Sequence, residues 1–169
     1  EIKELNADEI KMNALQIEKL YWNVVNKQTV KLGTVNAAYF YELKKDLKQN
    51  FEFKGLYWQG VLVGFYTYIF YDSKMETHYI GLDYEANKKF KLYFNILFLS
   101  TKKMIERKDV HLELGRTARD AKLNLGAMPR QVINYINIKN PVVKIAVYFI
   151  LKRLNNKSKD QFTDRTPLK

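Results

Sequence analysis

The sequence contains no cysteine and two histidines, so several kinds of chemistry have no residues to carry them. Without cysteine there is no disulfide, no thiolate metal ligand and no cysteine nucleophile. His78 and His111 are too few and too far apart along the chain for a histidine-based metal centre, and we expect His78 to be a packed or hydrogen-bonded residue. A Ser-His-Asp order, a P-loop and a phosphate loop with paired glycines are also missing. The sequence therefore disfavours metal catalysis and predicts no metal site.

Long apolar runs are missing as well. Residues 145–151 form a run of seven apolar residues, whereas a helix that crosses a bilayer needs ~20. We expect such a segment to pack on this domain's own sheet, with an anionic membrane surface or a missing domain as the alternative partner. The N-terminus is acidic and lacks the apolar stretch of a secretory signal, which predicts a cytoplasmic protein. Because the first residue is Glu rather than Met, we expect the chain to begin inside a longer protein.

Aromatic and basic residues are plentiful. The 169 residues are 47% hydrophobic and include 12 Tyr and 10 Phe, enough for one folded domain with a core. Of the net charge of +11, residues 1–100 contribute +1 and residues 101–169 contribute +10. This asymmetry predicts an anionic partner for the second half, such as nucleotide phosphates, RNA or an acidic membrane surface. A basic surface that serves solubility alone is the alternative.

The spacing of apolar residues predicts an alternation of helices and strands. Helices are expected over 7–27 with Asn6 or Asp8 as the cap, over 36–49 with Asn36 as the cap, and at about 90–107, 118–125 and 141–154. Strands are expected over 53–58 and 61–71, joined as a hairpin around Gly60, and over 75–82, 111–115 and 130–138, with a polar connection at 83–91. We therefore expect one α/β domain over 1–154 and a polar, disordered tail over 155–169.

Residues 112–127, LELGRTARDAKLNLGA, carry the clearest candidate for ligand binding. A short apolar strand runs into Arg116, and Lys122 follows in a polar turn. Two cations thus lie past the end of a strand, where α/β folds bind ligands. We expect Arg116 and Lys122 to bind an anionic group of a substrate. The alternatives are a structural salt bridge from Arg116 to Asp120 or Glu113, and a solvated helix face for Lys122.

Carboxylates and tyrosines supply the acid–base candidates. Asp83 and Glu85 are candidates for orienting or deprotonating an attacking amine, with a turn or helix cap as the alternative for Asp83. Glu113 is a candidate base if its face of the strand lines a cleft. Tyr84 and Tyr79 are candidates for protonating a leaving group, with packing in the core or at its rim as the alternative.

Two segments resemble a known family. They are HYIGLDYEANKKFKLYFNILF at 78–98 and LGRTARDAKLNLGA at 114–127. Both resemble the C-terminal domain of FemAB-type and peptidoglycan-biosynthesis-related proteins, which have the GNAT acyltransferase fold. The residues that match, in order, are Gly81, Asp83, Tyr84, Gly115, Arg116, Lys122, Gly126 and Ala127. The resemblance implies a GNAT-like α/β fold with a mixed, mostly antiparallel sheet flanked by helices, and one half of a two-domain protein.

The segment that would bind the phosphates of an acyl donor departs from the family pattern. Acetyl-CoA-dependent GNAT enzymes usually carry Q/R-x-x-G-x-G/A after the fourth strand, where backbone N–H groups bind the pyrophosphate. Here residues 82–90 read LDYEANKKF, with no glycine and with Asp83 and Glu85 partly offset by Lys88 and Lys89. The resemblance therefore leaves two donors open. One is acetyl-CoA bound through Lys88 and Lys89, and the other is aminoacyl-tRNA, which FemAB-like members use.

The resemblance implies an acyltransferase that moves an acyl or aminoacyl group to an amine, on a cell-envelope precursor. The amine would attack a thioester or ester carbonyl in a cleft that positions the reactants and offers a backbone N–H to the oxyanion. Asp83, Glu113 and Tyr84 would supply acid–base chemistry. Arg116 and Lys122 would hold an anionic part of donor or acceptor. The alternative is a non-catalytic binding module of the same fold, which recognises tRNA or an envelope precursor through its basic second half.

Overall fold

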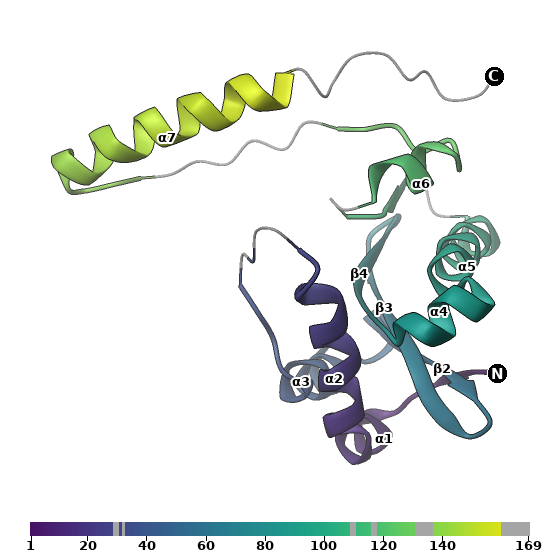
Figure 1. Cartoon of the computed structure of the whole chain (residues 1–169). Helices are drawn as coiled ribbons and strands as arrows, with labels where there is room; N and C mark the ends of the chain where they lie inside the picture. Colours follow the sequence, from purple (N-terminus) through teal and green to yellow (C-terminus); the bar gives the residue numbers. More distant parts are fainter. Residues whose placement is uncertain (29–30, 32, 109–110, 116–117, 131–136, 160–169) are drawn as a thin grey trace. The chain divides into compact units, whose positions relative to one another are not determined.

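The computed structural model describes residues 1–28, 31, 33–108, 111–115, 118–130 and 137–159. The chain forms two compact units, Glu1–Thr117 and Ala118–Lys169. The first unit contains a five-stranded sheet in the order β1-β2-β3-β4-β5 (Figure 1). Its strands are β1 (Ile2–Glu4), β2 (Phe51–Trp58), β3 (Val61–Tyr71), β4 (Lys74–Leu82) and β5 (His111–Glu113). Neighbouring strands are antiparallel except β4 and β5, which are parallel.

Helices lie on both faces of this sheet. Those of the first unit are α1 (Ala7–Met12), α2 (Ala14–Val25), α3 (Ala37–Leu47), the short 3₁₀ helix η1 (Lys48–Asn50), α4 (Tyr84–Phe90) and α5 (Leu92–Arg107). The second unit contains α6 (Arg119–Leu123) and α7 (Pro141–Lys159). The predicted fold class, a mixed and mostly antiparallel sheet flanked by helices, is confirmed. The predicted hairpin around Gly60 and the Asn36 cap of α3 are also present.

The helix predicted over 7–27 is two helices, α1 and α2, divided at Asn13. Asn6 caps α1: its side chain accepts the N–H of Glu9, and the Glu9 carboxylate accepts the N–H of Asn6. At the other end the Asn13 side chain donates to the carbonyl of Glu9 at 2.8 Å. This side-chain bond takes up a carbonyl at the end of α1 and favours a break there.

Helices α1–α3 cover one face of the sheet, and α4 and α5 cover the other (Figure 1). The core of the first face is aromatic, and the rings of Phe53 and Phe65 stack in it with centroids 4.8 Å apart. In the core of the second face, the hydroxyls of Tyr68 and Thr77 lie 3.1 and 3.2 Å from the Ser100 hydroxyl of α5. The strands are therefore buried on both sides, which explains their long apolar runs.

The polar connection predicted over 83–91 is in fact mostly helix α4. Asp83 caps this helix, and Lys91, with a left-handed φ of 53°, ends it before α5 begins. Ala86 is buried and Phe90 is half-buried, so a spacing of four residues gives α4 one apolar side. Two apolar positions are too few for a helical period to be recognised in the sequence.

One extra residue sits in β4 where this strand pairs with β3. Thr67 of β3 faces both His78 and Tyr79, which forms a β-bulge. The Thr67 hydroxyl accepts the N–H of Tyr79 at 2.9 Å and donates to its carbonyl at 3.3 Å, so it fills the gap in the ladder. Because of the bulge, two successive side chains lie on the same face of the sheet. The His78 ring lies 5.9 Å from that of Tyr39 in α3, and the Tyr79 ring lies 5.7 Å from that of Tyr21 in α2.

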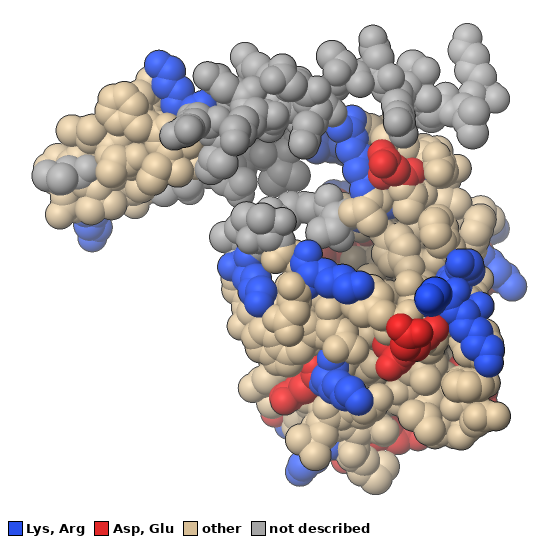
Figure 2. Space-filling model, viewed as in Figure 1, with Lys and Arg blue, Asp and Glu red and all other residues tan. Residues whose placement is uncertain are grey.

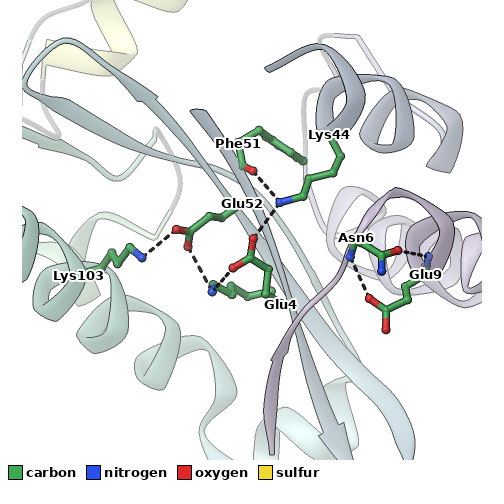
Figure 3. A network of polar contacts seen from close by, with 8 residues as sticks. Glu4, Asn6, Glu9, Lys44, Phe51, Glu52 and Lys103 are labelled. Carbon is green, nitrogen blue, oxygen red and sulfur yellow. Dashed lines mark hydrogen bonds and ion pairs between the residues drawn. The ribbon is translucent and has the colours of Figure 1, made fainter. Parts of the chain in front are cut away.

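A network of ion pairs joins helices from both sides of the sheet through β1 and β2 (Figure 3). Glu4 of β1 accepts from Lys44 of α3 at 2.8 Å and from Lys54 of β2 at 2.9 Å. Glu52 of β2 pairs with Lys54 at 3.3 Å and with Lys103 of α5 at 2.8 Å. The network accounts for the charged residues that interrupt the apolar pattern of β2, and it gives them a structural role.

In the second unit, α6 falls within the predicted 118–125 and α7 begins at the predicted proline. Helix α7 continues past residue 154, where the sequence predicts its end. Most of the strand predicted over 130–138 and the last part of the predicted tail, 160–169, lie outside the described residues. The single domain expected over 1–154 stays a prediction.

Candidate functional site

The neighbouring strands β4 and β5 pair over a short stretch, after which β5 ends. Lys74, Met75 and Glu76 of β4 pair with His111, Leu112 and Glu113 of β5. Strand β4 then continues to Leu82. Within the residues that the structure describes, no strand lies beside residues 77–82 on the side away from β3. We call this unpaired edge of β4, beyond the end of β5, the β4–β5 gap.

Backbone groups of β4 point into the β4–β5 gap. The N–H groups of Tyr79 and Asp83 both donate toward β3, to the Thr67 hydroxyl and the Val63 carbonyl, each at 2.9 Å. Peptide groups alternate in direction along a strand. The N–H of Ile80 therefore points away from β3, toward the gap. A backbone N–H in this position is the kind of donor that stabilises an oxyanion.

Two carboxylates lie at the start of the β4–β5 gap. Glu76 of β4 and Glu113 of β5 are paired in register, so their side chains lie on the same face of the sheet. Burial, and then the charge of Glu113, raise the pKa of the Glu76 carboxyl. Glu113 is exposed at the last residue of β5, and its role as a base stays a prediction. Glu76 is a candidate that the sequence analysis missed, although its spacing of two from His78 places both on one strand face.

His78 and Tyr39 form a polar contact beside these carboxylates. The Tyr39 hydroxyl lies 3.3 Å from Nε2 of His78, while Nδ1 is buried and has no hydrogen-bond partner among the described residues. Burial lowers the pKa of His78 to about 4, so the ring is neutral at neutral pH. Burial, with the neighbouring Tyr79 and Glu76, raises the pKa of Tyr39. As expected, His78 is a packed, hydrogen-bonded histidine.

The loop between β4 and α4 is held by the C-terminal end of α2. The Asn23 side chain donates to the Leu82 carbonyl at 3.0 Å. The Lys27 ammonium lies over the Tyr84 ring, 3.3 Å from its centroid, in a cation–π contact. Burial raises the pKa of Tyr84. Its phenol is therefore protonated at neutral pH, as the predicted role of proton donor requires.

Asp83 is the N-cap of α4, which is the structural alternative predicted for this residue. Its carboxylate accepts the N–H of Ala86 at 2.9 Å and caps α4. The exposed Glu85 follows in the first turn of the helix. Two carboxylates thus occupy the start of α4, and one of them already uses a helix N–H group.

Lys88 and Lys89 line a cleft of about 580 Å³ between the tip of the β2–β3 hairpin and α4. The Lys89 ammonium lies 4.4 Å from the centre of the Trp58 ring, and Trp58 lies against Phe90 with ring centroids 5.3 Å apart. Asp83 and Glu85 line the same cleft, which therefore carries charges of both signs. Glu113 is not among the lining residues, and the cleft adjoins β3, whereas the β4–β5 gap adjoins the opposite edge of β4.

Of the two predicted anion-binding cations, Lys122 is the one that the structure describes. Arg116 lies outside the described residues. Lys122 is 8% exposed on α6 of the second unit, and burial lowers its pKa to about 8. Most Lys122 side chains are still protonated at neutral pH with that value. The pairing of Arg116 with Lys122 around an anion stays a prediction.

Solved structures share the fold of this chain, although no family model matches its sequence and no curated protein is significantly similar to it. An aminoglycoside acetyltransferase from an uncultured soil metagenomic sample, solved with sisomicin, matches with a TM-score of 0.56 and 13% identity over 82% of this chain and 96% of its own. The chain has the GNAT acetyltransferase fold. A ribosomal-protein-alanine N-acetyltransferase from Brucella melitensis biovar Abortus 2308 matches at 0.54 and 17% identity, over 83% of this chain and 98% of its own.

A third GNAT-fold match is a predicted acetyltransferase from Clostridium acetobutylicum, solved with acetyl-CoA, at a TM-score of 0.61 and 7% identity over 81% of this chain and 95% of its own. The GNAT fold implied by the resemblance is thus confirmed, while the FemAB-type subgroup stays a prediction. At the start of α4 this chain does not fit a pyrophosphate, because the Asp83 carboxylate is bound to a helix N–H and Glu85 adds a second negative charge.

Two further properties of the described residues bear on cofactors and location. Across residues 1–108, 111–130 and 137–159, where described, no group of three or more His, Asp or Glu side chains is arranged to hold a metal ion. None of the helices that the structure describes is long and apolar enough to cross a membrane.

Proposed function

We propose that this chain is an N-acyltransferase whose reaction takes place in the β4–β5 gap. The observation that carries the proposal is that β5 ends at the Glu76–Glu113 pair while β4 continues to Leu82. The gap combines a backbone N–H, from Ile80, with a half-buried carboxylate of raised pKa, Glu76. These are the two kinds of group that attack by an amine on an activated carbonyl requires.

In the proposed mechanism the amine nitrogen forms a bond to the acyl carbon, and Glu76 takes the proton that the nitrogen loses. The N–H of Ile80 donates to the carbonyl oxygen as negative charge develops on it. The bond from the carbonyl carbon to the leaving sulfur or oxygen then breaks. The leaving atom takes up a proton, for which we propose Tyr84 as the donor. Burial, and then the charge of Glu113, raise the pKa of Glu76, which makes its carboxylate a stronger base than an ordinary glutamate.

The charges around α4 bear on how the donor is bound. The pyrophosphate of a CoA thioester has no suitable place at the start of α4, since Asp83 and Glu85 lie there. We propose that the anionic part of the donor is bound by basic side chains instead, with Lys88, Lys89, Arg116 and Lys122 as the candidates. Aminoacyl-tRNA, the donor of FemAB-type proteins, fits the basic second half of the chain. An acyl-CoA bound without the usual backbone contacts is the other candidate.

The acceptor is proposed to be a primary amine. The aminoglycoside and ribosomal-protein-alanine acetyltransferases named above have the same fold, which supports an amine of an amino sugar or of a peptide. A cell-envelope precursor that carries such an amine is the acceptor that the FemAB-type resemblance favours.

A non-catalytic binding module is the second candidate, and the Asp83 cap is the observation that favours it. A GNAT fold whose helix start no longer receives a pyrophosphate has lost one binding element of the enzymes with this fold. Such a module would recognise an anionic partner through the basic residues of its second half.

The test is a transfer assay with both donors. The chain is incubated with acetyl-CoA or with charged tRNA and a panel of primary amines, namely an amino sugar, an aminoglycoside and a peptide with a free N-terminus. Formation of the N-acyl product is measured by mass spectrometry. We expect product with at least one donor, and we expect Glu76→Gln to lower kcat by about 10²–10³ with little change in KM. Glu106→Gln, an exposed carboxylate change on α5, is the matched control. Absence of product with every pair, together with salt-sensitive RNA binding, would favour the binding module.

A further inference from the structure

Helix α7 exposes an apolar surface that the proposed function does not use. Over its first eleven residues, Val147 is the one described side chain that is half-buried rather than exposed. The large apolar residues and their exposed fractions are Val143 at 47%, Ile145 at 60%, Tyr148 at 59%, Phe149 at 63%, Ile150 at 57% and Leu151 at 45%. Contiguous exposed apolar residues of this size mark a surface that binds something.

The same helix is basic and has no acidic residue. Its charged residues are Lys144, Lys152, Arg153, Lys157 and Lys159. Lys144 and Lys152 are eight residues apart, with Tyr148 midway, so all three lie along one side of the helix. Figure 2 shows α7 as a largely uncharged surface that carries a few Lys and Arg side chains. Apolar and cationic groups are therefore presented together.

We infer that α7 binds the surface of an anionic membrane, with its axis in the plane of the interface. Its apolar side chains enter the boundary between headgroups and acyl chains, and its ammonium groups pair with acidic lipid headgroups. Tyr148 is of a residue type that favours headgroup depth, and Phe149 is of a type found on the apolar face of interfacial helices. Because no described helix is able to cross a bilayer, α7 lies on the membrane rather than through it.

The exposed apolar side chains of α7 favour lipid over RNA as the partner. RNA phosphates would neutralise the lysines, but they would leave Ile145, Ile150 and Leu151 in water. An anionic membrane satisfies both the cations and the aliphatic side chains of the same helix. The inference concerns the second unit alone and does not depend on acyl transfer in the β4–β5 gap.

The experiment is flotation of the full chain with lipid vesicles. Vesicles of phosphatidylcholine alone and of phosphatidylcholine with 30% phosphatidylserine are compared at 50 and 300 mM salt. We expect binding to the anionic vesicles that weakens with salt, and little binding to the neutral ones. The charge variant Lys144→Glu with Lys152→Glu should lower the affinity about tenfold or more. The control Lys45→Glu with Lys102→Glu changes the net charge equally, on exposed sites of α3 and α5, and should have a much smaller effect.

The apolar contribution is tested by Ile145→Ser with Phe149→Ser, which should reduce flotation at both salt concentrations. Met12→Ser with Leu15→Ser is the matched control, since these apolar residues of α1 and α2 are 76% and 87% exposed. Equal losses in the two double variants would overturn the proposal, as would unaltered flotation of the α7 variant. A fall in Tm of several degrees in the α7 variant would mean that these side chains are buried in solution, which also contradicts it. Salt-sensitive binding to RNA without flotation would identify a nucleic acid as the partner instead.

Discussion

Glu76 and Glu113 lie opposite each other at the last pair of residues that joins β4 to β5. Burial, together with the like charge of Glu113, makes Glu76 easier to protonate than an ordinary glutamate. Removing the charge of Glu113 should therefore lower the pKa of Glu76, and this effect is open to measurement.

Glu113→Gln is expected to move the acid limb of the pH–rate profile to lower pH. The neutral amide removes the repulsion that favours protonation of Glu76, so the pKa of Glu76 falls and the base is ionised at lower pH. The measurement is kcat/KM between pH 4 and 9 with whichever donor supports transfer. Glu106→Gln should leave the profile in place, and an unshifted profile for Glu113→Gln would show that the two carboxylates are not coupled.

His78 is expected to make the protein less stable in acid. Its pKa is about 4 in the folded chain and ordinarily 6.5, so between these values the unfolded chain binds a proton that the folded chain does not. The stability present above pH 6.5 is therefore lost as the pH falls toward 4. His78→Gln should show a smaller fall in Tm over this window. His111→Gln, an exposed change on β5, should follow the parent protein, and a parallel fall in all three would argue against the burial of His78.

Asp83→Asn separates the two roles considered for this residue. Asparagine keeps the cap on Ala86, whereas it cannot accept a proton from an amine. If Asp83 serves as a cap, Asp83→Ala should lose about 1 kcal/mol of unfolding free energy, and Asp83→Asn should keep both stability and activity. The measurements are urea unfolding and transfer rate. A large loss of rate in a fully stable Asp83→Asn would restore the catalytic assignment.

Gly81→Ala is expected to destabilise the fold through a steric clash. A Cβ at this position would lie 2.1 Å from the Phe65 ring, which is fully buried and stacked on Phe53. Overpacking of this kind costs about 1–3 kcal/mol. Urea unfolding provides the measurement, and Phe65→Leu should recover part of the loss in the double variant. The recovery would not occur if the strain lay in the backbone rather than in the contact.

The sequence predicts the layers of the fold well, because helix caps and apolar periodicity are local signals. Asn6 and Asn36 cap helices as expected, and the Gly60 hairpin is in place. The break at Asn13 and helix α4 were missed. The break depends on one side-chain hydrogen bond, and α4 buries too little apolar surface to produce a period.

The candidate site was less predictable, since it depends on which strands stop pairing. The sequence points to Glu113 as a candidate. Glu76 becomes a candidate only because it pairs with Glu113 across the parallel strands, and these two residues are far apart in the chain. Lys88 and Lys89 were expected to face donor phosphates, and they lie in a cleft beside Trp58 and two carboxylates. The other wall of that cleft is the tip of the β2–β3 hairpin, and the local sequence around Lys88 does not predict where that tip lies.

The bulge at His78 and Tyr79 changes which residues of β4 face each side of the sheet. Before it, Met75 packs in the core beside α5, and after it Ile80 does so, although the two positions differ by an odd number of residues. If β4 kept all of its residues and lost the bulge, regular alternation would exchange the two layers for the rest of the strand. Ile80 would turn toward the aromatic core under α2, and the N–H that it offers to the β4–β5 gap would turn toward β3. The donor that β4 offers to the β4–β5 gap thus depends on the bulge as much as on the identity of any side chain there.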